Sequence, residues 1–262
     1  MAPWRFLTWQ RVPATALRVD SPRDEARLAL AFALAYVAMS AVTGLVQRAW
    51  PAPLMGATLL TSDAWYTFGY KIGLLLVVPL VALRRAGYRA GDLLAGWRAT
   101  PGSILKVALG FGAGLLVNAG KLDDIGGALA TMAGPEAAAR VLAGGGLMLF
   151  TAGLPEEIVY RGVLQTRLEL LWGRFAALVV TALLFTAWHL PSRYLLASGA
   201  EGTAGDLGSV LLGTGLPVLV GAVVFGWAWD RWRNLPVLVA VHWGIDVLPS
   251  VASFLKLPPG TH

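Results

Sequence analysis

The sequence predicts an all-α, multi-pass membrane protein, a polytopic bundle of about seven transmembrane helices. The chain has 262 residues, of which 56% are hydrophobic and 14% are charged, whereas a soluble domain carries about 25% charged residues. The mean hydropathy is +0.64. The charges fall in clusters between long apolar stretches, which lipid accommodates and a soluble core does not. Many of the eleven Trp stand at the ends of these stretches, as interfacial anchors do.

Charge and cysteine content exclude several classes of protein. The net charge is +6, but the basic residues lie beside hydrophobic segments. That placement is typical of topology determinants, so the expected partner is the lipid bilayer and not a nucleic acid. Cysteine is absent, which excludes disulfides, thiolate metal sites and cysteine nucleophiles. No cleavable signal peptide is recognised, because the first apolar run is too long.

The N-terminal part of the chain is expected to precede the membrane domain. Residues 1–27 contain two Trp and five Arg, and they are expected to be cytoplasmic or to lie on the membrane surface. Residues 28–262 are expected to form one membrane domain without an internal repeat. Its first spans are expected at 28–46 and at 65–83, and the second of these contains Lys71.

The third span, 104–119, is short and rich in glycine. Its Gly110 and Gly114 form a small-xxx-small pattern, which permits close helix packing. The polar segment 121–140 is expected outside the membrane or at its interface. The remaining spans are expected at 147–171, which Pro155 interrupts, at 175–196, at 210–229, which Pro217 interrupts, and at 235–255.

The basic residues of the connecting segments alternate between heavily and lightly charged loops. By the positive-inside rule, the N-terminus is expected in the cytoplasm and the C-terminus outside. An odd number of spans agrees with this alternation and supports seven. The composition, rich in Ala, Gly, Leu and Arg, favours a bacterial inner membrane.

Ionisable side chains inside predicted spans are the strongest functional signal, because each costs several kcal/mol in hydrocarbon unless it is paired or hydrated. Most of them fall in three short segments. The members are Glu156, Glu157 and Arg161 in the first, His189 in the second, and His242 and Asp246 in the third. We therefore expect an active site inside the bundle.

In the first segment, Glu157 and Arg161 are four residues apart, the favourable order for an ion pair on one helix face. Glu156 is left without that partner and beside a like charge, which suits a general base. Pro155 has no N–H and is expected to loosen the preceding turn and admit water.

The other two segments each carry an imidazole. His189 follows Phe185 by one turn, and Phe185 either walls the site or packs in the core. Asp246 follows His242 by one turn, and a carboxylate at that spacing can accept an imidazole N–H and select its tautomer. Alternatively, Asp246 faces the outer aqueous edge.

The chemistry of this set allows two interpretations. Glu156, His189 and His242 could bind a divalent metal such as zinc and leave a position open for water. Without metal, a Glu helped by a His could activate water while the other His stabilises an oxyanion. The motif HExxH is absent, which excludes the zincin arrangement.

Depth in the membrane is a partial test of this set. From the expected cytoplasmic ends, Glu157 and His189 each lie about 14 residues in, or ~20 Å along a helix. They can therefore meet. His242 lies only about seven residues in, so tilt, a bend or an earlier span boundary near Pro236 would have to close the gap.

The three segments resemble the signature of the CPBP family, the CAAX prenyl endopeptidases and the bacteriocin-processing or immunity (Abi) membrane proteases. Its pattern is EExxxR, then FxxxH, then HxxxN or HxxxD on separate membrane helices. The sequence reads Glu156-Glu157-Ile-Val-Tyr-Arg161, then Phe185-Thr-Ala-Trp-His189, then His242-Trp-Gly-Ile-Asp246. The family-like core would span about 140–255.

The resemblance implies an intramembrane endopeptidase, of glutamic or metalloprotease mechanism, acting on membrane-associated or lipidated substrates. Glu156 would activate water with His189, Glu157 would pair with Arg161, and His242 and Asp246 would assist the oxyanion or the metal. Asp246 stands where many members have Asn, and an ionised Asp cannot donate a hydrogen bond. The alternatives are a non-catalytic immunity or scaffold protein and a small proton-coupled transporter.

Overall fold

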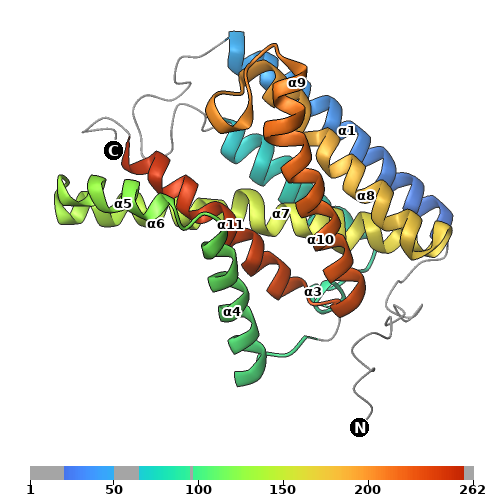
Figure 1. Ribbon diagram of the computed structural model, residues 1–262. Helices are drawn as coiled ribbons and strands as arrows, with labels where there is room; N and C mark the ends of the chain where they lie inside the picture. Colours follow the sequence, from blue (N-terminus) through green and yellow to red (C-terminus); the bar gives the residue numbers. More distant parts are fainter. Residues whose placement is uncertain (1–20, 50–64, 95–96, 257–262) are drawn as a thin grey trace. The chain divides into compact units, whose positions relative to one another are not determined.

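The computed structural model describes residues 21–49, 65–94 and 97–256, and every regular element in these ranges is a helix (Figure 1). The predicted all-α class is therefore confirmed. The chain divides into two compact units. The first unit takes Met1–Pro51 and Val159–Arg233, and the second takes Ala52–Ile158 and Asn234–His262. That residues 28–262 form a single domain stays a prediction, and most of the predicted segment 1–27 lies outside the described residues.

The first unit contains the long helices α1, α8 and α10. Their bounds, with those of the shorter elements, are α1 (Pro22–Ala49), η5 (Ile158–Gln165, in this unit from Val159), α8 (Thr166–Leu196), η6 (Gly199–Glu201), α9 (Leu207–Val210), η7 (Leu211–Gly215) and α10 (Leu216–Trp232). Here η5 and η7 are π-helical and η6 is a 3₁₀ turn.

The second unit contains the remaining elements. They are η3 (Trp65–Val77), α2 (Val78–Arg85), α3 (Ala90–Leu93), α4 (Pro101–Val117), α5 (Lys121–Ala130), α6 (Gly134–Met148), η4 (Leu149–Gly153), α7 (Leu154–Glu157) and α11 (Leu235–Leu255). Both η3 and η4 are π-helical.

Helix α1 begins at Pro22, earlier than the predicted span at 28–46. Ser21 caps its first turn, since the backbone N–H of Asp24 donates to Ser21 Oγ at 3.4 Å. Proline at the first helical position and acidic residues in the first turn favour a helix start. Hydropathy located the apolar part of this helix and missed its polar first turn.

In the first unit, α1 and α8 pack side by side (Figure 1). A Cβ on Gly44 of α1 would lie 3.0 Å from the Cα of Ser192 in α8, so only glycine allows this approach. Within α8, Gly173 has φ 77° and ψ 171°, which breaks the helix between the predicted spans 147–171 and 175–196. Glycine reaches this backbone conformation at little cost.

In the second unit, α4 and α11 cross at two glycines. A Cβ on Gly114 would lie 2.2 Å from the carbonyl oxygen of Val241, and one on Gly244 would lie 2.3 Å from that of Phe111. Just beyond the crossing, Asn118 Nδ2 donates to the carbonyl oxygen of Ile245 at 2.7 Å. The close packing that the small-residue pattern predicts is present, and it holds the middle of α11 in place.

Helix α6 is held against α11 by polar contacts as well as by packing. Trp243 Nε1 donates to the carbonyl oxygen of Gly145 at 2.7 Å, and Ser250 Oγ donates to that of Gly144 at 2.9 Å. Arg140, 1% exposed, pairs with Glu136 at 2.6 Å and donates to a backbone carbonyl of α11. Glu136 and this carbonyl compensate the buried guanidinium of Arg140. The segment 121–140, predicted outside the membrane or at its interface, contains α5 and the start of α6.

The predicted count of seven spans is not confirmed. The described residues contain four helical stretches long and apolar enough to cross a membrane, or five if the bent pair Pro101–Val117 and Lys121–Ala130 is one span. One stretch, Gly134–Leu196, covers two predicted spans. Large apolar side chains are exposed along the stretches, for example Leu116 and Leu142, which suits contact with lipid. The chain is an integral membrane protein.

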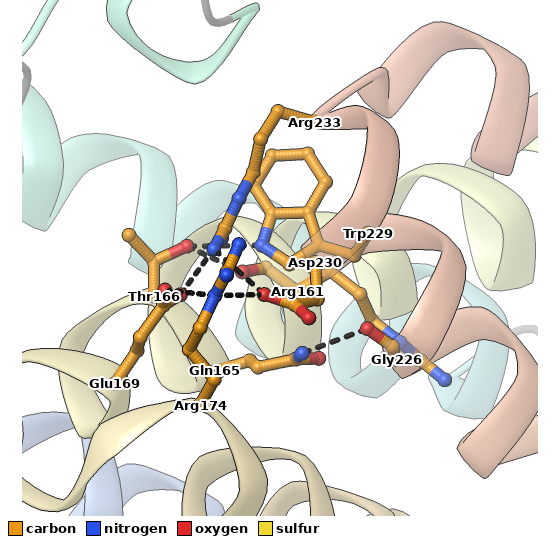
Figure 2. Close-up of polar contacts among 9 residues, drawn as sticks. All are labelled: Arg161, Gln165, Thr166, Glu169, Arg174, Gly226, Trp229, Asp230 and Arg233. Carbon is orange, nitrogen blue, oxygen red and sulfur yellow. Dashed lines mark hydrogen bonds and ion pairs between the residues drawn. The ribbon is translucent and has the colours of Figure 1, made fainter. Parts of the chain in front are cut away.

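A cluster of four charged side chains joins α8 to the end of α10 in the first unit (Figure 2). We call Glu169, Arg174, Asp230 and Arg233 the balanced cluster. Arg174 Nε lies 2.8 Å from Asp230 and 3.3 Å from Glu169, and Arg233 pairs with the same two carboxylates. Two guanidinium groups thus meet two carboxylates beside the break at Gly173, which fixes this end of the unit.

Candidate functional site

The two glutamates of the first predicted motif lie on a short α-helical turn between two π-helical segments, and its Arg161 lies on the second of these segments. Helix α7 spans Leu154–Glu157, with η4 before it and η5 after it. Pro155 lacks an N–H, so the preceding turn has one hydrogen bond fewer, and π-helical geometry occurs where the sequence predicted a loosened turn. Such segments are frequent at functional sites. Gly153 permits the approach to α11, since its Cβ would lie 3.3 Å from that of Trp243.

Glu156 forms a buried ion pair with a lysine from another helix of the second unit. Lys71 Nζ, on η3, lies 2.7 Å from Glu156 Oε1. The two side chains are 13% and 4% exposed. Charge-assisted bonds of this length are strong, and each charge offsets the cost of burying the other.

His242 of α11 lies among three carboxylates of the second unit. Its Nδ1 is 2.7 Å from Glu157 Oε1, which is fully buried. Its Nε2 is 3.6 Å from Glu156 Oε2 and 3.3 Å from Asp246 Oδ2. The difference in depth expected from the sequence therefore does not separate His242 from the two glutamates. We call Lys71, Glu156, Glu157, His242 and Asp246 the carboxylate cluster.

Asp246 occupies the place that its spacing from His242 predicts. It stands one turn further along α11 and turns its carboxylate to the imidazole, while its side chain remains 30% exposed. The contact of Asp246 with His242 is present, and its place at the outer aqueous edge stays a prediction. A carboxylate in this position orients the ring.

The remaining predicted residues lie in the first unit. His189 is half-buried, and its Nδ1 lies 2.9 Å from the carbonyl oxygen of Phe185. A carbonyl only accepts, so Nδ1 of His189 is the donor in this contact. Phe185 contacts the His189 ring and also stacks on the Arg161 guanidinium at 4.7 Å. The approach of His189 to Glu156, and that of Arg161 to Glu157, stay predictions.

Lys71 was not among the residues predicted for the site. It stands inside the predicted span 65–83, which is not among the described stretches long and apolar enough to cross a membrane, and a lysine in an apolar segment is by itself a signal of function. Its carboxylate partner lies 85 residues away in the chain. No spacing rule for a single helix reaches over that distance, so the sequence indicated an unusual lysine without indicating its partner.

The arrangement of these donors bears on the predicted metal. Lys71 places an ammonium on Glu156 Oε1, where a divalent cation would meet a like charge. Within the described ranges, no three or more His, Asp or Glu side chains are grouped to hold an ion. Glu156 and His242 in this arrangement do not fit a divalent cation. The set of Glu156, His189 and His242 as zinc ligands stays a prediction.

Residues 138–248 match the family model described as type II CAAX prenyl endopeptidase Rce1-like. This match is consistent with the CPBP family, so the predicted resemblance is confirmed, and it implies protease activity. Neither a curated protein nor a solved structure matched the chain. The matched segment contains α7, His189 on α8, and α11 as far as Leu248.

Proposed function

We propose that this protein is an intramembrane endopeptidase that cleaves membrane-associated or lipidated substrates with water activated by Glu156. The observation that carries the proposal is the meeting of Glu156 and Glu157 with one imidazole, His242, at 3.6 and 2.7 Å. A carboxylate and a neighbouring imidazole can act as general base and general acid in hydrolysis. The family match supports a protease.

The hydrolytic step follows from the chemistry of a buried carboxylate. Glu156 accepts a proton from water while the water oxygen bonds to the carbonyl carbon of the scissile peptide. The carbonyl oxygen becomes an oxyanion. The same proton then passes from Glu156 to the leaving nitrogen, the C–N bond breaks, and the products are a carboxyl group and an amine.

The other members of the site position groups or stabilise charge in this proposal. Glu157 holds Nδ1 of His242, so Nε2 faces Glu156. A protonated His242 would donate to the oxyanion, and Asp246 would stabilise its charge. His189 is proposed to assist Glu156, and Arg161 to pair with Glu157. In the neutral ring, a proton on Nδ1 bonded to the Phe185 carbonyl would make Nε2 the acceptor.

The proposed substrates are CAAX-like or bacteriocin-related peptides that carry a lipid or lie against a membrane. The description of the matched family names a prenyl endopeptidase, which supports a lipidated substrate. The proposed setting is a bacterial inner membrane, with the N-terminus in the cytoplasm. The excess of basic residues before the first span supports that orientation.

Cleavage of a prenylated peptide by the purified protein tests the proposal. The wild type is expected to cleave it, and Glu156→Gln to lower kcat/KM by about 10²–10⁴-fold, since the base is lost while the shape is kept. The matched control is Glu201→Gln, because Glu201 forms an exposed pair with Arg193. Cleavage by Glu156→Gln at the wild-type rate would overturn the proposal.

Two further arms separate the alternatives. Cleavage that survives a strong chelator supports the glutamate route, whereas loss of cleavage restored by zinc supports the metal set. A scaffold protein would bind the peptide without cleaving it, in the wild type and in Glu156→Gln alike. A transporter would show flux into proteoliposomes without cleavage.

A further inference from the structure

Lys71 is the one member of the carboxylate cluster that lies outside the segment matched by the family. It comes from η3, whose sequence is otherwise free of charge, WYTFGYKIGLLLV. Placing an ammonium among these residues is unfavourable unless a partner receives it. The partner is Glu156, the residue to which we assign the chemistry.

The contact distinguishes the two oxygens of Glu156. Oε1 receives the ammonium at 2.7 Å, and Oε2 faces His242 Nε2 at 3.6 Å. The ion pair at one oxygen restrains rotation of the carboxylate about the Cγ–Cδ bond. Lys71 therefore fixes the direction in which the other oxygen is presented to the imidazole.

The separation between Oε2 and Nε2 is wider than a direct hydrogen bond. A water molecule that hydrogen-bonds to both groups therefore lies beside the pair and not between its atoms. In the proposed reaction the attacking water takes this place, beside Oε2 and the imidazole. The residue that fixes Oε2 therefore also fixes the place of attack.

We propose that Lys71 is a positioning residue of the peptidase, which holds Glu156 so that Oε2 faces the reacting water. This inference rests on the proposed function. It gives a residue of η3 a role in the reaction, although none of the three family motifs includes that residue. The rival interpretation is a purely structural tie between η3 and α7.

Kinetics of Lys71 variants distinguish a positioning role from a structural one. Lys71→Met keeps most of the side-chain volume and removes the charge. It is expected to lower kcat by about 100-fold, the effect of a misplaced reacting group, with KM changed less than about threefold. Lys71→Arg restores an Nη–carboxylate bond and is expected to recover at least a tenth of the wild-type kcat.

The matched control is Lys121→Met, since Lys121 pairs with Asp124 on the exposed face of α5. It is expected to keep the wild-type kcat. If Lys71→Met also keeps it, the inference is wrong and the proposed function stands. If the wild type cleaves no peptide, the proposed function fails and the role of Lys71 falls with it.

A second measurement tests the pairing without using activity. Thermal unfolding in detergent is measured for the wild type, Lys71→Met, Glu156→Gln and the double variant. Removing one partner of a buried pair strands the other, so Lys71→Met is expected to lower Tm less in the Glu156→Gln background. Additive shifts in Tm would overturn the pairing from which the inference starts.

Discussion

The balanced cluster of the first unit and the carboxylate cluster of the second both contain buried charges, yet they differ in charge and in residue type. In the balanced cluster, Arg174 and Arg233 each contact Glu169 and Asp230 (Figure 2). Every carboxylate there meets two guanidinium groups, which stay protonated. In the carboxylate cluster, three acids surround one imidazole and one of them also receives a lysine.

The difference separates structural from chemical use of buried charge. In the balanced cluster each carboxylate is held by two guanidinium groups, which neither give up nor accept protons at ordinary pH, and there is no imidazole. In the carboxylate cluster, carboxylates meet an imidazole, and both kinds of group can exchange protons. Burial alone therefore does not identify an active site, because both clusters contain buried charges. The type and balance of the groups do.

The largest effect is expected from Asp230→Asn in the balanced cluster. Asp230 is 2% exposed and contacts both arginines. Its loss leaves buried guanidinium charge uncompensated, which should cost about 3–5 kcal/mol of unfolding free energy. Thermal melting measures this cost, with the exposed Asp124→Asn as control. The protein that remains folded should cleave at the wild-type rate, and a fall in its kcat would erase the distinction between the two clusters.

The next effect is expected from Glu157→Gln in the carboxylate cluster. This variant should lose activity more than stability, the reverse of Asp230→Asn. Gln keeps an oxygen for His242 Nδ1 but loses the charge that holds the ring. We expect kcat/KM to fall about 100-fold, within the range for loss of one electrostatic contact at a reacting centre. The melting temperature should fall less than in Asp230→Asn. A stability loss without a kinetic loss would assign Glu157 to structure.

A moderate effect is expected at the crossing that carries His242. Gly114→Ala forces a Cβ against the backbone of α11, which should cost about 1–3 kcal/mol of stability. It should also lower kcat, because α11 carries His242 and Asp246. Gly112→Ala is the matched control on the same helix, since its Cβ would meet nothing within 4 Å. Equal melting temperatures for the two variants would contradict the close crossing.

The smallest effect is expected from Asp246→Asn. Asp246 contacts His242 Nε2 at 3.3 Å and is partly exposed, so water screens part of its charge. Asn keeps an acceptor oxygen toward the ring. We expect kcat/KM to change by about tenfold or less, in keeping with a peripheral charge–imidazole contact. A loss as large as that of Glu156→Gln would place Asp246 among the reacting groups.

Much of the second unit's site could be predicted from the sequence. The one-turn spacing of His242 and Asp246 is a local pattern that a helix converts directly into a shared face, and the adjacent Glu156 and Glu157 are recognisable as two acids inside an apolar stretch. The glycine pattern on α4 predicted a close helix contact for a similar reason. The start of α1 at Pro22 and the burial of Arg140 were missed, because hydropathy treats every charge as a loop residue.

The sequence by itself determined that the chain is helical and apolar enough for a membrane, and which ionisable residues stand inside its apolar stretches. Those properties depend on composition and on spacing within one helix. Only the tertiary structure decided that Lys71 binds Glu156 and that His242 lies between Glu157 and Asp246. Partners 85 residues apart are joined by the packing of helices, and the period of a single helix contains no information about which other helix it meets.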